Sequence, residues 1–195
     1  DAQESRGLGD VYKRQEKNIP AFYPLRSGYT TGACATAAAK AALTALILGE
    51  EQKMISFRLP DDEEMTLPVA HTEIEKNSAT CTVVKDAGDD PDVTHGASIV
   101  VTVSFSNHPD IRFLQGEGVG RVTLPGLGLE IGEPAINRIP RQMIMKELSA
   151  LYDKGLDVTI SVPGGKELAQ RTFNPKLGIV DGISIIGTSG IVRPF

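Results

Sequence analysis

The chain has 195 residues, of which 41% are hydrophobic and 23% are charged, as expected for a globular protein with one good core or two small ones. A net charge of −5 and an aromatic content of 5% without Trp argue against binding to nucleic acid or to an anionic membrane surface. The two cysteines, Cys34 and Cys81, are too few for a disulfide scaffold and predict reduced, buried thiols in a cytoplasmic protein.

The N-terminal stretch lacks the apolar core of a signal peptide, and no apolar run approaches the length expected of a membrane span. Residues 1–15 resemble translated sequencing-adapter sequence, so we treat them as a foreign leader and set them aside. Residues 16–25 contain Pro20 and Pro24, which favour an extended chain.

The next stretch begins as a polar loop, Arg26 to Gly32, and becomes an alanine-rich run that ends before Gly49. Alanine is the best helix former and glycine a common stop, so a helix is predicted over about residues 32–48. Thr30 and Thr31 are natural N-caps. With Arg26 beside them they also suit an anion at the positive end of the helix dipole. An anion site is no better supported by these residues than the alternative, in which the threonines only cap the helix and the alanines only pack against the core.

Apolar and polar residues alternate over 54–59 and 65–69, which predicts a hairpin of two strands. Residues 70–78 are polar and are interpreted as a solvated face. Two further strands, about 78–85 and 97–105, enclose an acidic loop. Its spacing does not fit an EF-hand, because Pro91 and Ala97 stand where Gly and Glu are needed. A solvated turn with Asp caps is as well supported as a functional loop with Lys85 and the Gly88 hinge.

Glycines at 116–128 match neither a Rossmann fingerprint nor a phosphate loop and predict backbone pressed against a ligand or another strand. A helix is predicted over about 140–152, with Pro140 as its first residue and Asn137 as its cap. A strand at 157–162, a short helix at 166–172, a turn at 177–182 and a strand at 183–186 follow. The fold class is therefore α/β of the α+β type: a mixed sheet with the alanine-rich helix packed on it.

Five blocks in order resemble the CbiD family: residues 26–42, 85–94, 118–127, 134–141 and 182–194. Together they cover about residues 24–195. CbiD chains are considerably longer than this one, and their C-terminal portion is a Rossmann-like region that helps bind the methyl donor. The resemblance therefore implies that residues 16–195 are a CbiD-like N-terminal region that carries the substrate-facing groups and lacks the C-terminal donor-binding region.

The resemblance implies an S-adenosylmethionine-dependent methyltransferase. The family methylates C1 of cobalt-precorrin-5B, giving cobalt-precorrin-6A in anaerobic cobalamin biosynthesis. Because this tetrapyrrole carries many carboxylates, Arg26, Arg121, Arg138, Arg141 and Lys85 are expected to bind them. Thr30, Thr31, Gly32 and Asp86 complete the expected substrate-binding set. Asp89 and Asp90 are the expected catalytic groups, with Asp86 paired to Lys85 or a loop amide. The methyl donor is expected at Gly187, Thr188 and Gly190. No protein metal site is expected, and the fragment alone is not expected to methylate.

Two other classes of function stay open. One is a phosphate- or nucleotide-binding transferase that uses the helix N-terminus at Thr30, Thr31 and Gly32, although that loop lacks a phosphate-binding lysine. The other is a non-catalytic module that binds carboxylates. The sequence leaves the oligomeric state undetermined.

Overall fold

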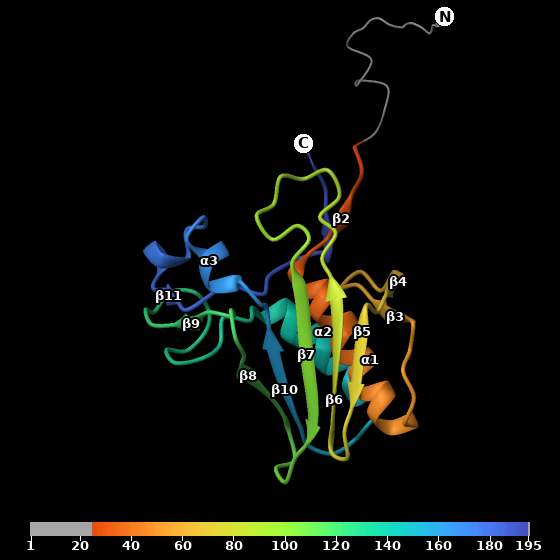
Figure 1. The fold of residues 1–195 in the computed structure, drawn as a ribbon. Helices are drawn as coiled ribbons and strands as arrows, with labels where there is room; N and C mark the ends of the chain where they lie inside the picture. The colour runs from red at the N-terminus through yellow and green to blue at the C-terminus, as the bar shows by residue number, and fades with distance from the viewer. Residues whose placement is uncertain (1–24, 195) are drawn as a thin grey trace, which may run out of the picture.

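The structure is a computed structural model that describes residues 25–194, so the predictions for the leader and for residues 16–24 lie outside the described chain. A five-stranded sheet in the order β5-β6-β7-β10-β8 is its centre (Figure 1). β10 pairs antiparallel with β7 and parallel with β8, so the sheet is mixed, as predicted. Its strands are β5 (His71–Ile74), β6 (Ser78–Val84), β7 (Ser98–Phe105), β8 (Ile111–Gln115) and β10 (Leu156–Ser161).

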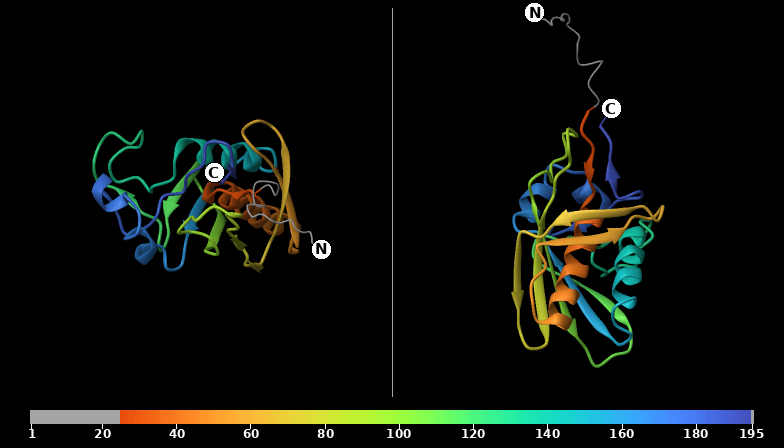
Figure 2. Two further views of the ribbon diagram at one scale, coloured as in Figure 1. Left: turned by 90° about the horizontal axis from the view of Figure 1, so that it is seen from above. Right: turned by 90° about the vertical axis from the view of Figure 1, so that its right-hand side faces the viewer.

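Two helices, α1 (Thr31–Leu48) and α2 (Arg138–Ser149), lie on one face of this sheet (Figure 2). The strands turn alternate residues toward them, which places β-branched side chains such as Val101 and Val158 in the core. All the alanines of α1 are buried. Their small side chains allow the helix backbone to approach both the sheet and α2 closely. The predicted packing of the alanine-rich helix on a mixed sheet is therefore confirmed.

The ends of α1 follow the predicted signals. The Thr30 hydroxyl oxygen accepts a 3.0 Å hydrogen bond from the Ala33 amide, and the helix begins one residue earlier than predicted. Gly49 ends it in the left-handed conformation, with φ of 76°. Contrary to the expectation from sequence, α1 is long and apolar enough for a membrane span. However, 72% of it is buried inside the fold, as in a core helix.

Several local predictions need correction. The predicted hairpin is present as β3 (Met54–Arg58) and β4 (Glu64–Pro68). The polar stretch 70–78 is not simply a solvated face, because β5 forms there by pairing with β6 at the edge of the sheet. Strand β8 was not predicted from the sequence. α2 begins at Arg138, so Pro140 is its third residue, and Asn137 stands at the cap position without a side-chain cap bond.

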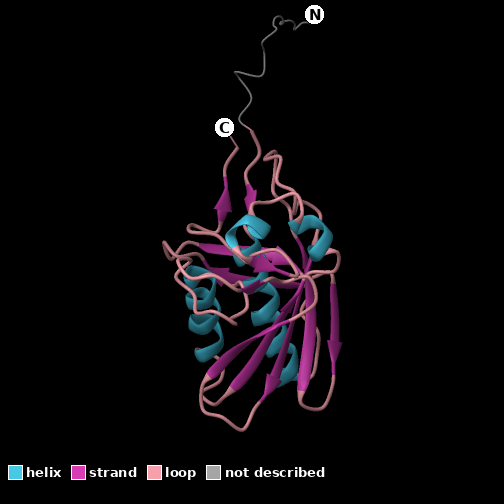
Figure 3. Ribbon diagram, turned by 90° about the vertical axis from the view of Figure 1, so that its left-hand side faces the viewer, coloured by secondary structure: helices cyan, strands magenta, loops and turns pink. Residues whose placement is uncertain are grey.

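The second part of the fold surrounds the upper end of the sheet (Figure 3). It contains α3 (Gly165–Ala169), the short 3-10 helix η2 (Asn174–Leu177), and two small paired sheets. One sheet joins β9 (Arg121–Val122) to β11 (Ile179–Val180), and the other joins β2 (Gly28–Tyr29) to β12 (Ile191–Val192). Residues 183–186, predicted as a strand, form only isolated bridges, Val119 to Ile183 and Ile136 to Ile185.

The glycine-rich segment approaches protein backbone closely. A Cβ at Gly118 would strike the Val162 carbonyl oxygen and lie 2.9 Å from the Gly165 nitrogen. The close approach predicted for this segment is therefore made, at Gly118, to the chain that follows β10.

Candidate functional site

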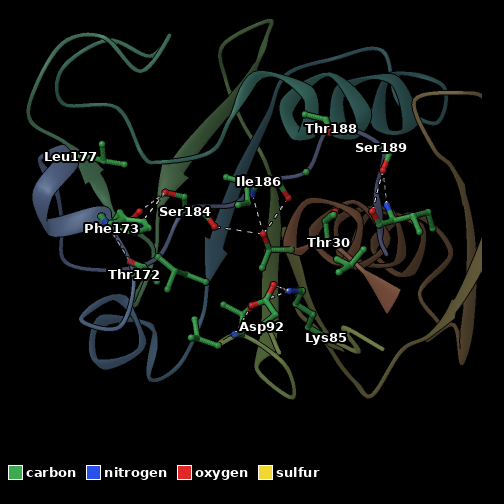
Figure 4. Close-up of a pocket in the computed structure, with 18 residues that line it drawn as sticks. Thr30, Lys85, Asp92, Thr172, Phe173, Leu177, Ser184, Ile186, Thr188 and Ser189 are labelled. Atoms are coloured by element: carbon green, nitrogen blue, oxygen red, sulfur yellow. Dashed lines mark hydrogen bonds and ion pairs between the residues drawn. The ribbon is translucent and has the colours of Figure 1, made fainter. Parts of the chain in front are cut away.

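A cavity of about 530 Å³ opens where the N-terminal end of α1 meets the loop after β6. Residues 172–177 and the segment 183–192 complete its walls (Figure 4). A volume of this order is usual for small-molecule sites. Most of the lining is apolar or hydroxylic, and its charged members among the described residues are Lys85 and Asp92. The cavity can therefore take a largely apolar ligand that has a few polar groups.

Lys85 is the most deeply buried charge of this cavity, with only 2% of its side chain exposed. It directly follows β6, and the alternation of that strand puts it on the same face as the core residues Cys81 and Val83. Its Nζ donates hydrogen bonds of 2.7 Å to Asp92 Oδ2 and 2.6 Å to Thr94 Oγ1. Asp86 was expected to pair with Lys85 or with a loop amide, and Asp92 occupies the place beside Lys85, which leaves the loop amide as the partner of Asp86.

Asp92 is held as a carboxylate by these contacts. Burial is the largest influence and opposes ionisation, but hydrogen bonds from Lys85 and from the Thr94 hydroxyl and amide outweigh it and lower the pKa of Asp92. Asp92 Oδ1 accepts from the Thr94 amide at 2.7 Å and from the Thr94 hydroxyl at 2.6 Å. Lys85, Asp92 and Thr94 thus form a fixed cluster in the cavity wall.

The N-terminal end of α1 is tied to the segment 183–192. The Thr31 hydroxyl oxygen accepts a 2.9 Å hydrogen bond from the Ile186 amide. The Gly32 amide donates to the Ile186 carbonyl at 2.9 Å, and the Ala33 amide donates to Thr30. Gly187 packs so closely on Thr30 that a Cβ there would strike the Thr30 hydroxyl. Two early helical amides therefore already have partners inside the fold, which leaves less of the helix end open to an anion than the sequence suggested.

Asp86 and Asp89 of the acidic loop are exposed, whereas Asp92 lies in the cavity wall. Arg26 Nη1 lies 2.7 Å from Asp86 Oδ2, and both side chains are more than half exposed. The hydrogen bond from Arg26 is the main reason that the pKa of Asp86 is lowered, and the Gly88 amide adds to it. The expectation that Asp86 accepts from a loop amide is thus confirmed. The Asp89 carboxylate accepts the Arg26 backbone amide at 2.5 Å, so it holds the loop to the chain before β2.

The other predicted arginines lie away from this cavity. Arg141 donates to the carbonyls of Ile136 and Pro134, pairs with Glu133 at 2.9 Å, and lies over the Phe113 ring. These contacts engage the Arg141 guanidinium within the fold, so it is not free to bind a carboxylate of a ligand. Arg138 lines a second cavity of about 530 Å³, which shares Ile186, Gly187 and Thr188 with the first. The segment 186–188 thus contributes to the walls of both cavities.

The structure brings together part of the predicted site. The predicted residues that line the cavity at the N-terminal end of α1 are Thr30, Thr31, Lys85, Gly187 and Thr188. Gly32 lies directly behind Thr31. The lining does not include Arg26, Asp86, Asp89, Asp90, Arg121, Arg138, Arg141 or Gly190. Residues that were expected to bind substrate and residues that were expected to bind the methyl donor therefore share one cavity.

Sequence reasoning missed several lining residues, among them Asp92, Phe173 and Asn174. One signal for Asp92 was present, because period-2 alternation along β6 makes Lys85 inward-facing, and a buried lysine requires an acid partner nearby. Phe173 and Asn174 are joined to the site only by tertiary folding. The Asn174 side chain fixes this segment in place by donating a hydrogen bond to the Gly182 carbonyl at 3.1 Å. Across residues 25–194, no group of three His, Cys, Asp or Glu side chains is arranged to hold a metal ion.

The chain is similar to known proteins over most of its length. The family model described as CbiD matches residues 19–194. Two curated relatives are named cobalt-precorrin-5B C(1)-methyltransferase. The one from Geobacillus kaustophilus is 56% identical over 176 residues, covering 88% of this chain and 47% of the relative. The one from Leptospira borgpetersenii is 51% identical over 175 residues, with the same coverage of both chains.

A crystal structure of the cobalamin biosynthesis protein cbiD from Archaeoglobus fulgidus has a TM-score of 0.66 and 34% identity to this chain. The match covers 88% of this chain and 55% of that one. The chain thus spans about half the length of the curated relatives that it matches. The match to the family model, the identity to the curated relatives and the shared fold lead to one conclusion: the chain belongs to the CbiD family.

Proposed function

We propose that this chain supplies the N-terminal half of a cobalt-precorrin-5B C1-methyltransferase that uses S-adenosylmethionine and forms cobalt-precorrin-6A in cobalamin biosynthesis. The family match and the names of the curated relatives support the reaction. The observation that carries the proposal is the cavity at the N-terminal end of α1, where three blocks of the family signature meet around Thr31, Lys85 and Gly187.

In the proposed reaction, C1 of the macrocycle supplies the electron pair of the new C–C bond. The sulfonium sulfur keeps the pair of the broken C–S bond, so S-adenosylhomocysteine leaves. The main requirements are alignment of the two reactants and exclusion of water. A cavity of about 530 Å³ with mostly apolar walls suits the methyl donor or one edge of the macrocycle. The whole corrinoid plate would extend beyond it, toward parts of the protein outside this chain.

The acidic loop and the exposed basic residues complete the proposal. Asp89 and Asp90 are proposed to face the substrate from the loop, although the Asp89 carboxylate also binds the Arg26 amide. Arg26 and Arg138 are both exposed, but Arg26 is paired with Asp86. Arg138, which has no side-chain partner among the described residues, is therefore proposed to bind a peripheral carboxylate of the tetrapyrrole, and Arg26 to do so only by leaving Asp86. A cytoplasmic location is proposed because both cysteines are free and buried.

The two alternative functions are less well supported. A nucleotide phosphate at the helix N-terminus would need free amides, but Gly32 and Ala33 donate within the fold. A non-catalytic carboxylate-binding module would need no largely apolar cavity, whereas this chain has one of about 530 Å³.

A chimera tests the proposed function. Residues 19–194 of this chain replace the matching half of the Geobacillus kaustophilus relative, and the purified chimera is incubated with cobalt-precorrin-5B and S-adenosylmethionine. The expected result is a product that carries one additional methyl group by mass spectrometry. The unaltered relative is the positive control. A chimera that is folded by circular dichroism and does not methylate would contradict the proposal.

A further inference from the structure

Lys85 has one ammonium proton more than the fold uses. A lysine ammonium has three N–H donors and no acceptor. Asp92 and Thr94 take two of them, and no third partner of Nζ exists among residues 25–194. The side chain is 98% removed from solvent, and it lines the cavity (Figure 4). A buried donor without an acceptor is unfavourable, so an oxygen that enters the cavity next to Nζ would be bound strongly.

The cluster around Lys85 fixes this donor, and its internal hydrogen bonds already use both oxygens of Asp92, Oδ2 with Lys85 and Oδ1 with Thr94. The ammonium is therefore held in place by two short contacts while its remaining proton stays available. The cavity presents a second donor in Thr30, whose oxygen accepts the Ala33 amide. The Thr30 hydroxyl proton has no acceptor within the part of the chain that the structure describes. Unused donors in an apolar cavity select a ligand with acceptor oxygens.

We propose that Lys85 is a binding residue that takes a carboxylate of the ligand in this cavity, with Asp92 and Thr94 as the residues that position its ammonium group. The ligand class is a carboxylic acid with an apolar body. The inference rests on the proposed function for its two candidate ligands, because both carry carboxylates. One is the methionine carboxylate of the methyl donor, and the other is an acetate or propionate side chain of the corrinoid.

Pairs of ligands that differ only in the carboxylate test this inference on the 195-residue chain itself. The first pair is S-adenosylhomocysteine and its carboxyl methyl ester, which keeps the amino group and lacks only the carboxylate charge. The second is dicyanocobyrinic acid and its heptamethyl ester. Calorimetry is expected to show that one of the two pairs binds. Within that pair, the acid should bind at least about tenfold more tightly than its partner, because a hydrogen bond to a charged group contributes that much to affinity. The pair that discriminates identifies the source of the carboxylate.

A double variant then assigns the preference to Lys85. Lys85→Met alone would leave the Asp92 charge buried and unpaired, so it is combined with Asp92→Asn, which keeps an acceptor for Thr94. This variant is expected to bind the acid no more tightly than wild type binds the carboxylate-free partner. The matched control, Lys40→Met with Glu147→Gln, removes the other largely buried lysine pair, which lies outside the cavity lining. It should keep the preference.

Three results would overturn the inference: binding of neither acid by the wild-type chain, equal affinity within both ligand pairs, or a folded Lys85 double variant that keeps the preference. The comparison of ligand pairs needs no variant, so poor folding of the double variant leaves the test decisive. Methyl transfer by the chimera is a separate measurement. An active chimera without carboxylate preference rejects the role of Lys85 alone, and carboxylate binding with an inactive chimera rejects the proposed function alone.

Discussion

The Thr31 hydroxyl oxygen accepts a hydrogen bond of 2.9 Å from the Ile186 amide, although 155 residues separate the two in sequence. Thr31 is 3% exposed and belongs to the first turn of α1, whereas Ile186 lies in the segment that walls the cavity. This contact and the Gly32 amide bond to the Ile186 carbonyl fix that segment to the helix. Thr31 is thus a structural link between two walls of the site, while Thr30 caps the helix.

Thr31→Val should therefore weaken the fold. The substitution keeps the shape of the side chain but leaves the Ile186 amide without its partner, which should lower the free energy of unfolding by about 1–3 kcal/mol. Urea unfolding measures this change. Thr44→Val is the matched control, because the Thr44 hydroxyl only donates to the Lys40 carbonyl one turn earlier. Its cost should stay within about 0.5 kcal/mol. Equal losses for the two variants would contradict the linking role of Thr31.

Alanine substitutions at two glycines of the acidic loop distinguish the cost of backbone strain from the cost of steric crowding. Gly88 and Gly96 have φ of 66° and 81°, so alanine at either position should cost about 1 kcal/mol. A Cβ at Gly88 would also strike the Arg26 carbonyl oxygen, whereas nothing lies within 4 Å of one at Gly96. Gly88→Ala should thus lower the free energy of unfolding by at least about 1 kcal/mol more than Gly96→Ala. If the two variants unfold at the same urea concentration, the close packing of the loop on residues 26–27 is refuted.

Local signals predicted the elements that local chemistry determines. Thr30 and Gly49 bracket α1 because a hydroxyl cap and a left-handed glycine act within one helical turn. Strands β6 and β7 were found from their alternation. β5 was missed because its polar residues become a strand only by pairing with β6, an interaction that no local pattern records.

The site was less predictable because it is assembled from segments far apart in the chain. The contact between Thr31 and Ile186 and the position of Phe173 depend on tertiary folding. The pairing of Lys85 with Asp92 instead of Asp86 depends on the path of the loop, which brings Asp92 back to Lys85 from seven positions along the chain. Charge and proximity in sequence favoured Asp86, but Asp86 points outward to Arg26.

The Lys85–Asp92 pair predicts a loss of stability in acid. The pKa of Asp92 lies below its usual value of 3.8, so the pair stabilises the fold above the unfolded pKa, and this contribution is lost as the pH falls through the folded pKa. Asp92→Asn should cost roughly 2–3 kcal/mol at pH 7, since it leaves a buried ammonium without its counter-charge. The difference from wild type should shrink below about pH 4.

Urea unfolding of both proteins at several pH values measures this dependence. Asp62→Asn is the control, because Asp62 pairs with Lys146 at 3.5 Å on the exposed surface, where such pairs contribute little. A difference between wild type and Asp92→Asn that stays constant from pH 7 to pH 3 would show that the charge of Asp92 is not what stabilises the cluster.

Asp90 is the better candidate of the two proposed catalytic carboxylates. Asp89 already accepts the Arg26 amide, whereas the Asp90 carboxylate makes no hydrogen bond within the described chain. In the chimera, Asp90→Asn should lower kcat by about 100-fold and change KM little, which is the pattern of a contact made in the transition state. Asp61→Asn, in the exposed turn between β3 and β4, is the control. Unchanged kcat in the Asp90 variant would remove it from the proposed mechanism.

Cys34 should be an unreactive thiol until the protein unfolds. Burial is the main reason that the pKa of Cys34 is raised to about 12, so at pH 8 only about one molecule in ten thousand carries the reactive thiolate. The neutral thiol stabilises the fold fully below the unfolded pKa near 9, and that contribution is lost as the pH rises toward 12.

Labelling with a disulfide reagent at pH 8 should be slow in the folded protein and fast in urea. The Cys81→Ala and Cys34→Ala variants each leave one thiol and allow the two to be followed separately. Labelling of folded Cys81→Ala at the rate of free cysteine would show that α1 does not hold Cys34 in the core.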